Sequence, residues 1–220
     1  MEPKILCPSM FNLAIENMKE EIIELDKSGM DIFHVDIMDG TFVPNFAMSF
    51  REIDLIRKVS TKPIDCHLMV MEPRRYIKMA ADRGCDIIYI HPEAELIPTE
   101  TLGQIRDLGK KPGIVINPML SLEVVKEMLP IVDYVIIMGV NPGFAGRDFM
   151  DYLVPKFKDL TRYRAEKKLC FKIILDGGAD ERVIRLMYHD VGVEGYVLGK
   201  QLLFFQNKPY KDCIDFVRKI

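Results

Sequence analysis

Two short apolar segments of the sequence carry ionisable side chains where a buried strand is expected. The first, FHVDIM, contains His34 and Asp36, and the second, DCHLM, contains His67. Side chains alternate faces along a strand, so His34 and Asp36 lie on the same face. An unpaired charge is costly to bury, so this pair needs a compensating partner. Asp176 ends a third apolar segment, FKIILD, and completes a set of two imidazoles and two carboxylates.

This set has the donor chemistry of a metal site. Neutral imidazoles with carboxylates suit Zn²⁺, Mn²⁺, Fe²⁺ or Co²⁺ better than the oxygen-preferring Mg²⁺ or Ca²⁺. The alternative is that each residue is a hydrogen-bonded polar residue of the core, and any one of them alone would not decide the question. Because all four stand at the ends of apolar segments, we predict one divalent transition metal. Its ligands would be His34, Asp36, His67 and Asp176.

Eight apolar runs recur along the chain and must position these residues. They span 4–10, 31–38, 62–70, 86–93, 111–118, 133–140, 171–178 and 194–200. Between them, apolar residues recur at helical spacing, as over 14–27. Strands that alternate with helices pair in parallel through right-handed crossovers. Eight such units close a (β/α)₈ TIM barrel, an α/β fold whose active sites collect at the C-terminal ends of the strands.

An open, doubly wound sheet is the rival architecture. It usually carries a G-x-G-x-x-G turn after the first strand, and the segment CPSMFNLAIEN contains no such turn. No long linker rich in Pro, Gly or Ser divides the chain. We therefore predict a single TIM-barrel catalytic domain over residues 1–220, with the candidate ligands on one ring of strand ends.

Glycine-containing loops follow the last three predicted strands. They read NPGFAG, DGGA and LGK. Backbone N–H groups in such loops, close to a helix N-terminus, form a cradle for anions. Loops after the seventh and eighth strands are the recurring phosphate site of barrels. Turns need glycine in any case, so each loop alone is weak evidence; three in succession predict a phosphorylated substrate.

The composition excludes several other functions. Hydrophobic residues make up 49% of the chain and charged residues 29%, and the net charge of −3 offers no basic surface for nucleic acid. No apolar run is long enough to span a membrane, and the start, MEPKILCPSM, lacks the layout of a signal peptide. The five cysteines are scattered without a C-x-x-C pair, which is typical of reduced thiols in a cytoplasmic protein.

Four motifs of the sequence resemble the ribulose-phosphate 3-epimerase family. They are HVDIMDGTFVPN, DCHLMV followed by EPRRYI, NPGFAG and LDGG. The resemblance covers nearly the whole chain, from PSM near the start to LLF at 202–204. Within the family the chain looks closer to the D-allulose-6-phosphate 3-epimerase branch. It has FAG in place of FGG, has IHPE after the fourth strand, and lacks the SADF segment that usually follows the first serine.

The resemblance implies a barrel enzyme that inverts C3 of a ketose phosphate. Asp36 would match the base that removes the C3 proton, and Asp176 the acid that returns a proton to the opposite face. Inversion requires both carboxylates, because removal and delivery take place on different faces. His34 and His67 would match the remaining ligands of a metal that stabilises the cis-enediolate as a Lewis acid. Asp39, beyond the strand, is predicted to anchor a turn.

The resemblance also assigns substrate contacts. Phosphate or substrate binding is implied for Ser9, His67, Gly143, Phe144, Ala145, Gly146, Gly177, Gly178, Gly199 and Lys200. Methionines near the reacting carbons would be Met38, Met69 and Met138, whose alternative role is to fill gaps in the core. Ala145 and Lys200 depart from the residues usual in the family; Lys200 would either add a cation to the phosphate or face solvent. Arg147 would either meet the substrate or face solvent, and it is interpreted as a solvated surface residue.

The predicted reaction is the interconversion of D-allulose 6-phosphate and D-fructose 6-phosphate. The alternatives are epimerisation of D-ribulose 5-phosphate to D-xylulose 5-phosphate in the pentose phosphate pathway, and a sugar-phosphate-binding barrel without catalysis. Binding alone would not need both Asp36 and Asp176. Related decarboxylases carry a D-x-K-x-x-D strand end, and here DIMDG has no lysine; a Schiff-base aldolase likewise needs an inward lysine. The resemblance further implies a homo-oligomer, either a dimer or a hexamer.

Overall fold

The computed structural model describes residues 3–220 and contains a closed ring of parallel strands. The strands are β1 Ile5–Pro8, β2 Phe33–Asp39, β3 Phe46–Ala47, β4 Ile64–Met69, β5 Ile87–Ile90, β6 Lys111–Ile116, β7 Tyr134–Met138, β8 Lys172–Asp176 and β9 Gly195–Leu198. All except β3 correspond to the eight predicted runs. The addition, β3, is a two-residue strand that pairs antiparallel with the end of β2.

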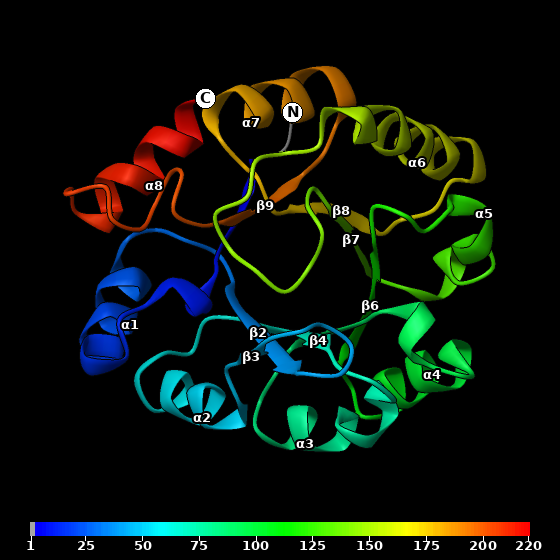
Figure 1. Cartoon of the computed structure of the whole chain (residues 1–220), viewed down its shortest axis with the longest axis horizontal. Coiled ribbons are helices and arrows are strands. Elements are labelled where there is room, and N and C mark those ends of the chain that lie inside the picture. The colour runs from blue at the N-terminus through cyan, green and yellow to red at the C-terminus, as the bar shows by residue number, and fades with distance from the viewer. Residues whose placement is uncertain (1–2) are drawn as a thin grey trace.

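Pairing of the strands follows the order β1-β9-β8-β7-β6-β5-β4-β2-β3. The ring closes between β1 and β2, where Ser9 and His34 form a parallel bridge and the Asp31 N–H donates to the carbonyl of Leu6 at 3.0 Å. Looking down the molecule, the strands form a central barrel with helices around it (Figure 1). The prediction of a TIM barrel is confirmed.

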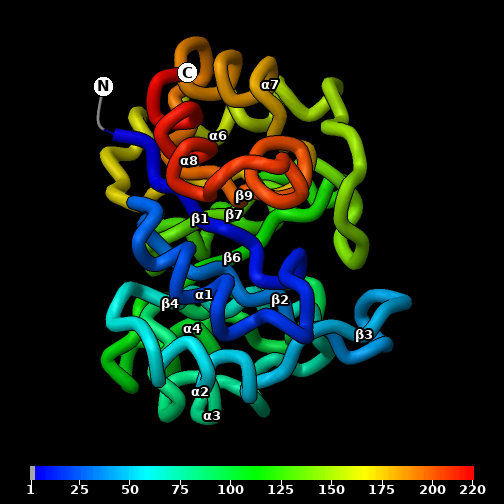
Figure 2. The backbone as a smooth tube through the Cα atoms, turned by 90° about the vertical axis from the view of Figure 1, so that its left-hand side faces the viewer, coloured from blue at the N-terminus to red at the C-terminus, as the bar shows by residue number. Residues whose placement is uncertain are grey.

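Helices cover the outside of the barrel (Figures 1 and 2). They are α1 Met18–Lys27, α2 Phe50–Val59, α3 Ile77–Asp82, α4 Pro98–Asp107, α5 Leu122–Val125, α6 Val154–Lys167, α7 Glu181–Leu186 and α8 Tyr210–Lys219. Short 3-10 turns occupy Met10–Asn12, Ile15–Asn17, Pro73–Arg75, Pro92–Ala94, Leu129–Ile131 and Asp151–Leu153, and a π-helical turn occupies Met187–Val191.

The first helix begins later than the sequence predicts. The pattern indicates a helix over 14–27, whereas α1 starts at Met18. Ala14 is extended, and the chain enters the helix through the 3-10 turn Ile15–Asn17. The Ile15 side chain is 84% exposed, so it has no core contact that would extend the helix toward the N-terminus.

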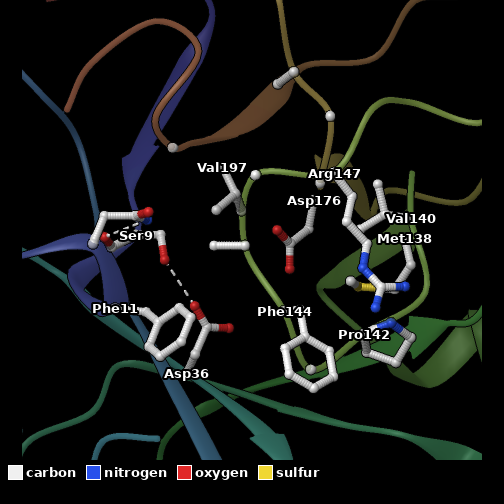
Figure 3. A pocket seen from close by; sticks show the side chains of 18 of the residues that line it. Ser9, Phe11, Asp36, Met138, Val140, Pro142, Phe144, Arg147, Asp176 and Val197 are labelled. Atoms are coloured by element: carbon white, nitrogen blue, oxygen red, sulfur yellow. Dashed lines mark hydrogen bonds between the residues drawn. The ribbon is translucent and has the colours of Figure 1, made fainter. Parts of the chain in front are cut away.

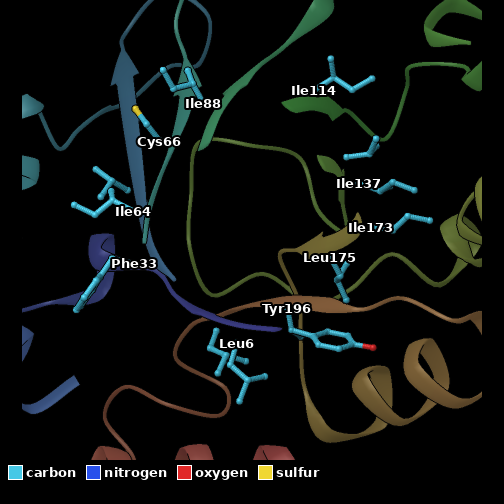
Figure 4. Packing of buried hydrophobic residues seen from close by; sticks show 14 of the residues in the cluster. Leu6, Phe33, Ile64, Cys66, Ile88, Ile114, Ile137, Ile173, Leu175 and Tyr196 are labelled. Carbon is cyan, nitrogen blue, oxygen red and sulfur yellow. The ribbon is translucent and has the colours of Figure 1, made fainter. Parts of the chain in front are cut away.

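Two apolar layers hold the barrel together. The outer layer lies between strands and helices and includes Phe33, Ile64, Ile137 and Tyr196 (Figure 4). The inner layer fills the barrel and includes Tyr89. A side chain at Gly113 would meet the Tyr89 ring at 2.3 Å, so glycine there makes room for the large ring. Strand alternation thus directs one face of each strand into the barrel.

Two further expectations concern membranes and cysteines. Within residues 3–220, no helix is long and apolar enough to cross a membrane. All five cysteines are unpaired, and four of them are buried, while Cys170 is exposed. The expectation that most cysteines are free core thiols is therefore confirmed.

Candidate active site

The register of neighbouring strands assembles the candidate metal ligands at the C-terminal end of the barrel. In the β2–β4 pair, Asp36 lies opposite His67, and His34 lies opposite Asp65. Asp176 ends β8 on the other side of the ring. Because His34 and Asp36 sit on the inward face of β2, all these side chains point into one region of the barrel.

Four ligand atoms from this region lie within 4.8 Å of one another, one each from His34, Asp36, His67 and Asp176. Oδ1 of Asp36 lies 3.1 Å from Nε2 of His34 and 3.1 Å from Nδ1 of His67. Oδ2 of Asp176 lies 3.3 Å from Nδ1 of His67 and 3.7 Å from Nε2 of His34. A tetrahedral site with bonds of about 2.0–2.1 Å separates its ligand atoms by about 3.3 Å, which these distances bracket. The cluster fits one metal ion.

The second nitrogen of His34 is also in contact with a carboxylate. Nδ1 of His34 lies 2.6 Å from Oδ1 of Asp65, and burial raises the pKa of Asp65. A carboxylate beside the far nitrogen of a ligating imidazole fixes its tautomer and its ring orientation. His34 is therefore oriented to present Nε2 to the cluster. Sequence analysis did not assign Asp65 to the site, although its place on the inward face beside His67 was a usable signal.

Charges within the cluster are strongly coupled. Burial opposes protonation of His34, but the carboxylates of Asp65 and Asp36 raise its pKa well above the ordinary value. Burial likewise opposes protonation of His67, and Asp176 and Asp36 outweigh it, so its pKa is also raised. Burial disfavours the charged form of Asp36, yet His34 and His67 hold its pKa far below the usual range. These imidazoles must give up their protons when they bind a metal.

The two catalytic candidates line a pocket that opens above the cluster. Asp36 and Asp176 come from different sides of the barrel, and their carboxylates point toward the middle of the pocket (Figure 3). The Ser9 hydroxyl donates to Oδ2 of Asp36 at 2.8 Å. His34 and His67 are fully buried below. The carboxylates are thus the groups of the cluster that a small molecule in the pocket would meet.

Glycine loops after β7, β8 and β9 form the other side of the pocket. Gly178 has φ +71°, and a side chain there would lie 2.4 Å from the backbone nitrogen of Phe149. This close approach requires glycine. The space between the atoms that line the pocket is about 570 Å³, open solvent at its mouth included.

Most of the predicted substrate-contact residues meet in this pocket. Its lining includes Ser9, Met38, Met69, Met138, Gly143, Phe144, Ala145, Gly146, Gly177, Gly178 and Gly199. Lys200 is not among the lining residues. Its side chain passes near Gly146, and its ammonium group lies 5.5 Å from the centre of the Phe205 ring.

Several residues of the site were not assigned by sequence analysis. Arg147 is exposed, but it lines the pocket and its guanidinium lies 5.2 Å from the centre of the Phe144 ring (Figure 3). The interpretation of Arg147 as a surface residue is confirmed, and the loop after β7 places this exposed side chain at the edge of the pocket. Asn45, in the FVPN segment, donates from Nδ2 to the carbonyl of Gly143 at 2.7 Å. Only the approach of two loops distant in sequence reveals that contact.

Comparisons with known proteins agree with this geometry. A model of the ribulose-phosphate 3 epimerase family matches residues 5–203. The chain is 41% identical over 176 residues to ribulose-phosphate 3-epimerase of Synechocystis, covering 79% of this chain and 76% of that protein. It is 38% identical over 216 residues to the chloroplastic ribulose-5-phosphate-3-epimerase of Arabidopsis thaliana, covering 97% of this chain and 76% of that protein.

Similarity to solved structures supports the fold. A crystal structure of KGPDC from Streptococcus mutans matches with a TM-score of 0.72 at 12% identity, covering 100% of this chain and 99% of that one. At this identity the likeness concerns the barrel alone. The family model and the curated relatives go further, because both span most of the chain, and the family model, over residues 5–203, includes the strands that carry the cluster. The chain therefore belongs to the ribulose-phosphate 3 epimerase family, and it is an isomerase.

Proposed function

We propose that this protein is a metal-dependent epimerase that interconverts D-ribulose 5-phosphate and D-xylulose 5-phosphate. The observation that carries the proposal is the placement of two carboxylates, Asp36 and Asp176, on different sides of one pocket and in one cluster with His34 and His67. Inversion at a carbon needs a proton acceptor on one face and a proton donor on the other. The cluster supplies both groups within reach of one substrate carbon.

Asp36 and Asp176 have opposite roles in the proton transfer. Asp36 takes the C3 proton, the electron pair of that C–H bond forms the C2–C3 double bond, and the π pair of the C2 carbonyl moves onto O2 to give a cis-enediolate. Asp176 then delivers its proton to the opposite face of C3. In the reverse direction the two carboxylates exchange roles. The Ser9 hydroxyl holds Oδ2 of Asp36 in place, and the metal, when bound, supplies Lewis-acid stabilisation of the enediolate charge.

The phosphate of the substrate is assigned to the glycine loops after β7, β8 and β9. Their backbone N–H groups offer hydrogen bonds to an anion without requiring a buried cation. We place Lys200 at the rim of this cradle, where its charge attracts the phosphate, and Arg147 at the mouth of the pocket, where it can pair with the phosphate directly. Met38, Met69 and Met138 surround the reacting carbons with a polarisable apolar wall.

The five-carbon substrate has better support than the six-carbon substrate that the sequence motifs favour. The relatives from Synechocystis and Arabidopsis are both named as ribulose-phosphate epimerases and align over most of the chain. The FAG segment and the missing SADF segment still favour D-allulose 6-phosphate. Comparing kcat/KM for the two substrates separates them: a ratio above about tenfold, worth about 1.4 kcal/mol, assigns the specificity.

Proton exchange tests the reaction itself. Enzyme loaded with Zn²⁺, Mn²⁺, Fe²⁺ or Co²⁺ is incubated with each ketose phosphate in D₂O, and deuterium at C3 is followed by NMR. We expect deuterium to enter C3 of at least one substrate and its epimer. If neither substrate exchanges with any of these metals, while phosphosugar binding persists, the protein is a binding barrel without catalysis.

Two other expectations remain predictions. The resemblance implies a homo-oligomer, a dimer or a hexamer, which light scattering coupled to size exclusion would measure. A cytoplasmic location is consistent with the unpaired cysteines. Cell fractionation would test it.

A further inference from the structure

A chain of polar groups leads from the metal-ligand candidate His67 toward the protein surface. Nε2 of His67 lies 2.8 Å from Nε2 of His91, which is fully buried at the end of β5. Nδ1 of His91 faces Oε1 of Glu93 at 3.8 Å. Nδ2 of Asn117 donates to the same oxygen of Glu93 at 2.5 Å. These contacts lie outside the pocket lining, and the proposed reaction does not use them.

The contact between the two imidazoles allows only two arrangements of protons when both rings are neutral. One of the two Nε2 atoms must carry a hydrogen, and the other must accept it. If His67 donates, its Nδ1 has a free lone pair, and Nδ1 of His91 carries a hydrogen toward Glu93. If His91 donates instead, Nδ1 of His67 carries a hydrogen and cannot bind a metal. Nδ1 of His91 would then point a lone pair at a carboxylate.

Charge at Glu93 selects between these arrangements. Burial disfavours its charged form, but contacts with His91 and Asn117 lower its pKa, so the group is a carboxylate. At 3.8 Å the Glu93 oxygen lies beyond hydrogen-bond distance from Nδ1 of His91, but its negative charge favours the form of His91 with a hydrogen on Nδ1 over the form with a lone pair there. The Phe42 ring packs on His91 with centroids 4.5 Å apart, which restricts reorientation of the imidazole. Of the two neutral arrangements, the one that leaves Nδ1 of His67 free is thus favoured.

We infer that His91 and Glu93 are positioning residues that fix the tautomer of His67 and thereby set the metal affinity of the site. Asn117 holds the Glu93 carboxylate in place. The inference rests on the metal site of the proposed function. It adds a second contact that fixes the tautomer of a ligating imidazole, beside the contact of Asp65 with His34. The nitrogen of His34 that faces away from the cluster, Nδ1, contacts the Asp65 carboxylate directly. The corresponding nitrogen of His67, Nε2, contacts His91, and the carboxylate of Glu93 lies beyond that imidazole.

Zn²⁺ affinity, measured by competition with a chromophoric chelator, tests the inference. Glu93→Gln keeps the shape of the side chain but offers His91 both a donor and an acceptor, so the tautomer preference is lost. We expect Zn²⁺ binding to weaken about 10-fold to 100-fold. His91→Phe should weaken it at least as much, while His91→Gln, whose amide oxygen can accept from Nε2 of His67, should restore most of the affinity. Glu100→Gln and His189→Gln, at exposed positions, are the matched controls.

Spectroscopy supplies a readout that a purely structural role would not change. In the Zn²⁺-loaded wild type, long-range ¹H–¹⁵N NMR should show hydrogens on Nε2 of His67 and on Nδ1 of His91. In the Co²⁺-loaded protein, Glu93→Gln should alter the visible absorption bands, and Glu100→Gln should not. A hydrogen on Nε2 of His91, or equal Zn²⁺ affinity in Glu93→Gln and its control, would overturn the inference.

Failure of the inference is distinguishable from failure of the proposed function. If the wild type does not bind Zn²⁺ or Co²⁺, the proposed metal site itself is wrong, and the inference falls with it. If the wild type binds metal and exchanges the C3 proton, but Glu93→Gln binds metal equally well, only the positioning role of His91 and Glu93 is wrong. His91→Phe could fail to fold, since His91 is buried; Glu93→Gln, whose side chain is 28% exposed in the wild type, avoids that problem.

Discussion

The two sides of the pocket are built from different parts of the chain. On one side, side chains from β2, β4 and β8 make a compact cluster of imidazoles and carboxylates. On the other, glycine loops after β7, β8 and β9 present mainly backbone. The metal side depends on the identity and orientation of a few atoms, while the phosphate side depends on the path of the main chain. In the proposed function, the strands therefore carry the chemistry and the loops carry the anion binding.

The difference extends to how each side is held in place. His34 and His67 are completely buried, and each has a polar partner behind it, so removal of one group leaves others unpaired. In the glycine loops, main-chain conformation is the critical property, as the close approach of Gly178 to Phe149 shows. Substitutions on the metal side should therefore abolish chemistry, and those on the phosphate side should alter binding or stability.

A contact between loops joins the two sides. Asn45 in the β2–β3 hairpin donates to the carbonyl of Gly143 in the loop after β7. That hairpin and that loop both lie at the same end of the barrel, and the loop after β7 crosses the open end in Figure 1. Figure 2 shows the β3 hairpin projecting from this end. The two loops therefore meet at the end of the barrel where the pocket opens.

The largest effect is expected on the metal side, from Asp176→Asn. The amide cannot exchange the proton, and it is a poorer ligand than a carboxylate. General acid–base catalysis contributes about 10² to 10⁴ in rate, so we expect kcat/KM to fall by at least about 10³ with an unchanged circular dichroism spectrum. The control is Asp148→Asn, at an exposed position in the loop after β7. Loss of less than tenfold in kcat would remove Asp176 from the proton-transfer step.

A smaller effect, of a different kind, is expected on the phosphate side from Gly178→Ala. The position has φ +71° and no room beside Phe149. A left-handed conformation costs a non-glycine residue about 1–2 kcal/mol, and overpacking adds about 1–3 kcal/mol. We expect urea unfolding to show this loss and KM to rise, with a much smaller change in kcat than in Asp176→Asn.

Gly199→Ala is the matched comparison for Gly178→Ala. The nearest atoms to an added Cβ at Gly199 belong to Gln201 and Asn12, at 3.7 and 3.8 Å, which is ordinary contact. We expect unfolding free energy to change by less than about 0.5 kcal/mol and KM to rise only modestly. Equal destabilisation by the two substitutions would show that backbone conformation is not what distinguishes the two loops.

The smallest effect is expected from Asp39→Asn, at the start of the hairpin that carries Asn45. Oδ1 of Asp39 accepts from the N–H groups of Thr41 and Phe42, and Oδ2 accepts from the N–H of Met71, each at 2.8 Å. The prediction that Asp39 anchors a turn is confirmed by these bonds, but its predicted place beyond the strand is wrong, because Asp39 is the last residue of β2 and pairs with Phe46. The amide cannot accept all three, so we expect a loss of about 1 kcal/mol in unfolding free energy and a small rise in KM.

The pH dependence of that loss has a definite sign. Burial opposes ionisation of Asp39, but the backbone N–H groups of Met71, Phe42 and Thr41 lower its pKa. A carboxyl group whose folded pKa lies below its unfolded value of about 3.9 stabilises the fold above that value, and this contribution disappears as the pH falls through the folded pKa. The stability difference between wild type and Asp39→Asn should therefore be constant near neutral pH and shrink below about pH 4. A difference that grows in acid would contradict the assignment.

The sequence was sufficient for much of the fold and for the set of candidate ligands. Hydrophobic runs located all eight barrel strands, because a strand buried on both faces has few polar positions. The period of two placed His34 and Asp36 on one face, and the strand ends placed His67 and Asp176 near them. The family that the motifs resemble is the family that the comparisons show. The preference for the six-carbon substrate rested on short loop differences and has less support than the five-carbon alternative.

Contacts between distant segments lay beyond the sequence. Local patterns do not report the register that sets Asp36 opposite His67, nor which nitrogen of each imidazole faces the cluster. They also miss the place of Arg147 at the edge of the pocket and the displacement of Lys200 to its rim, because loop paths depend on what they pack against. The sequence by itself determined which chemical groups are available and on which face of each strand they lie. Only the tertiary structure decided their distances and partners, because these depend on packing between strands and loops far apart in the chain.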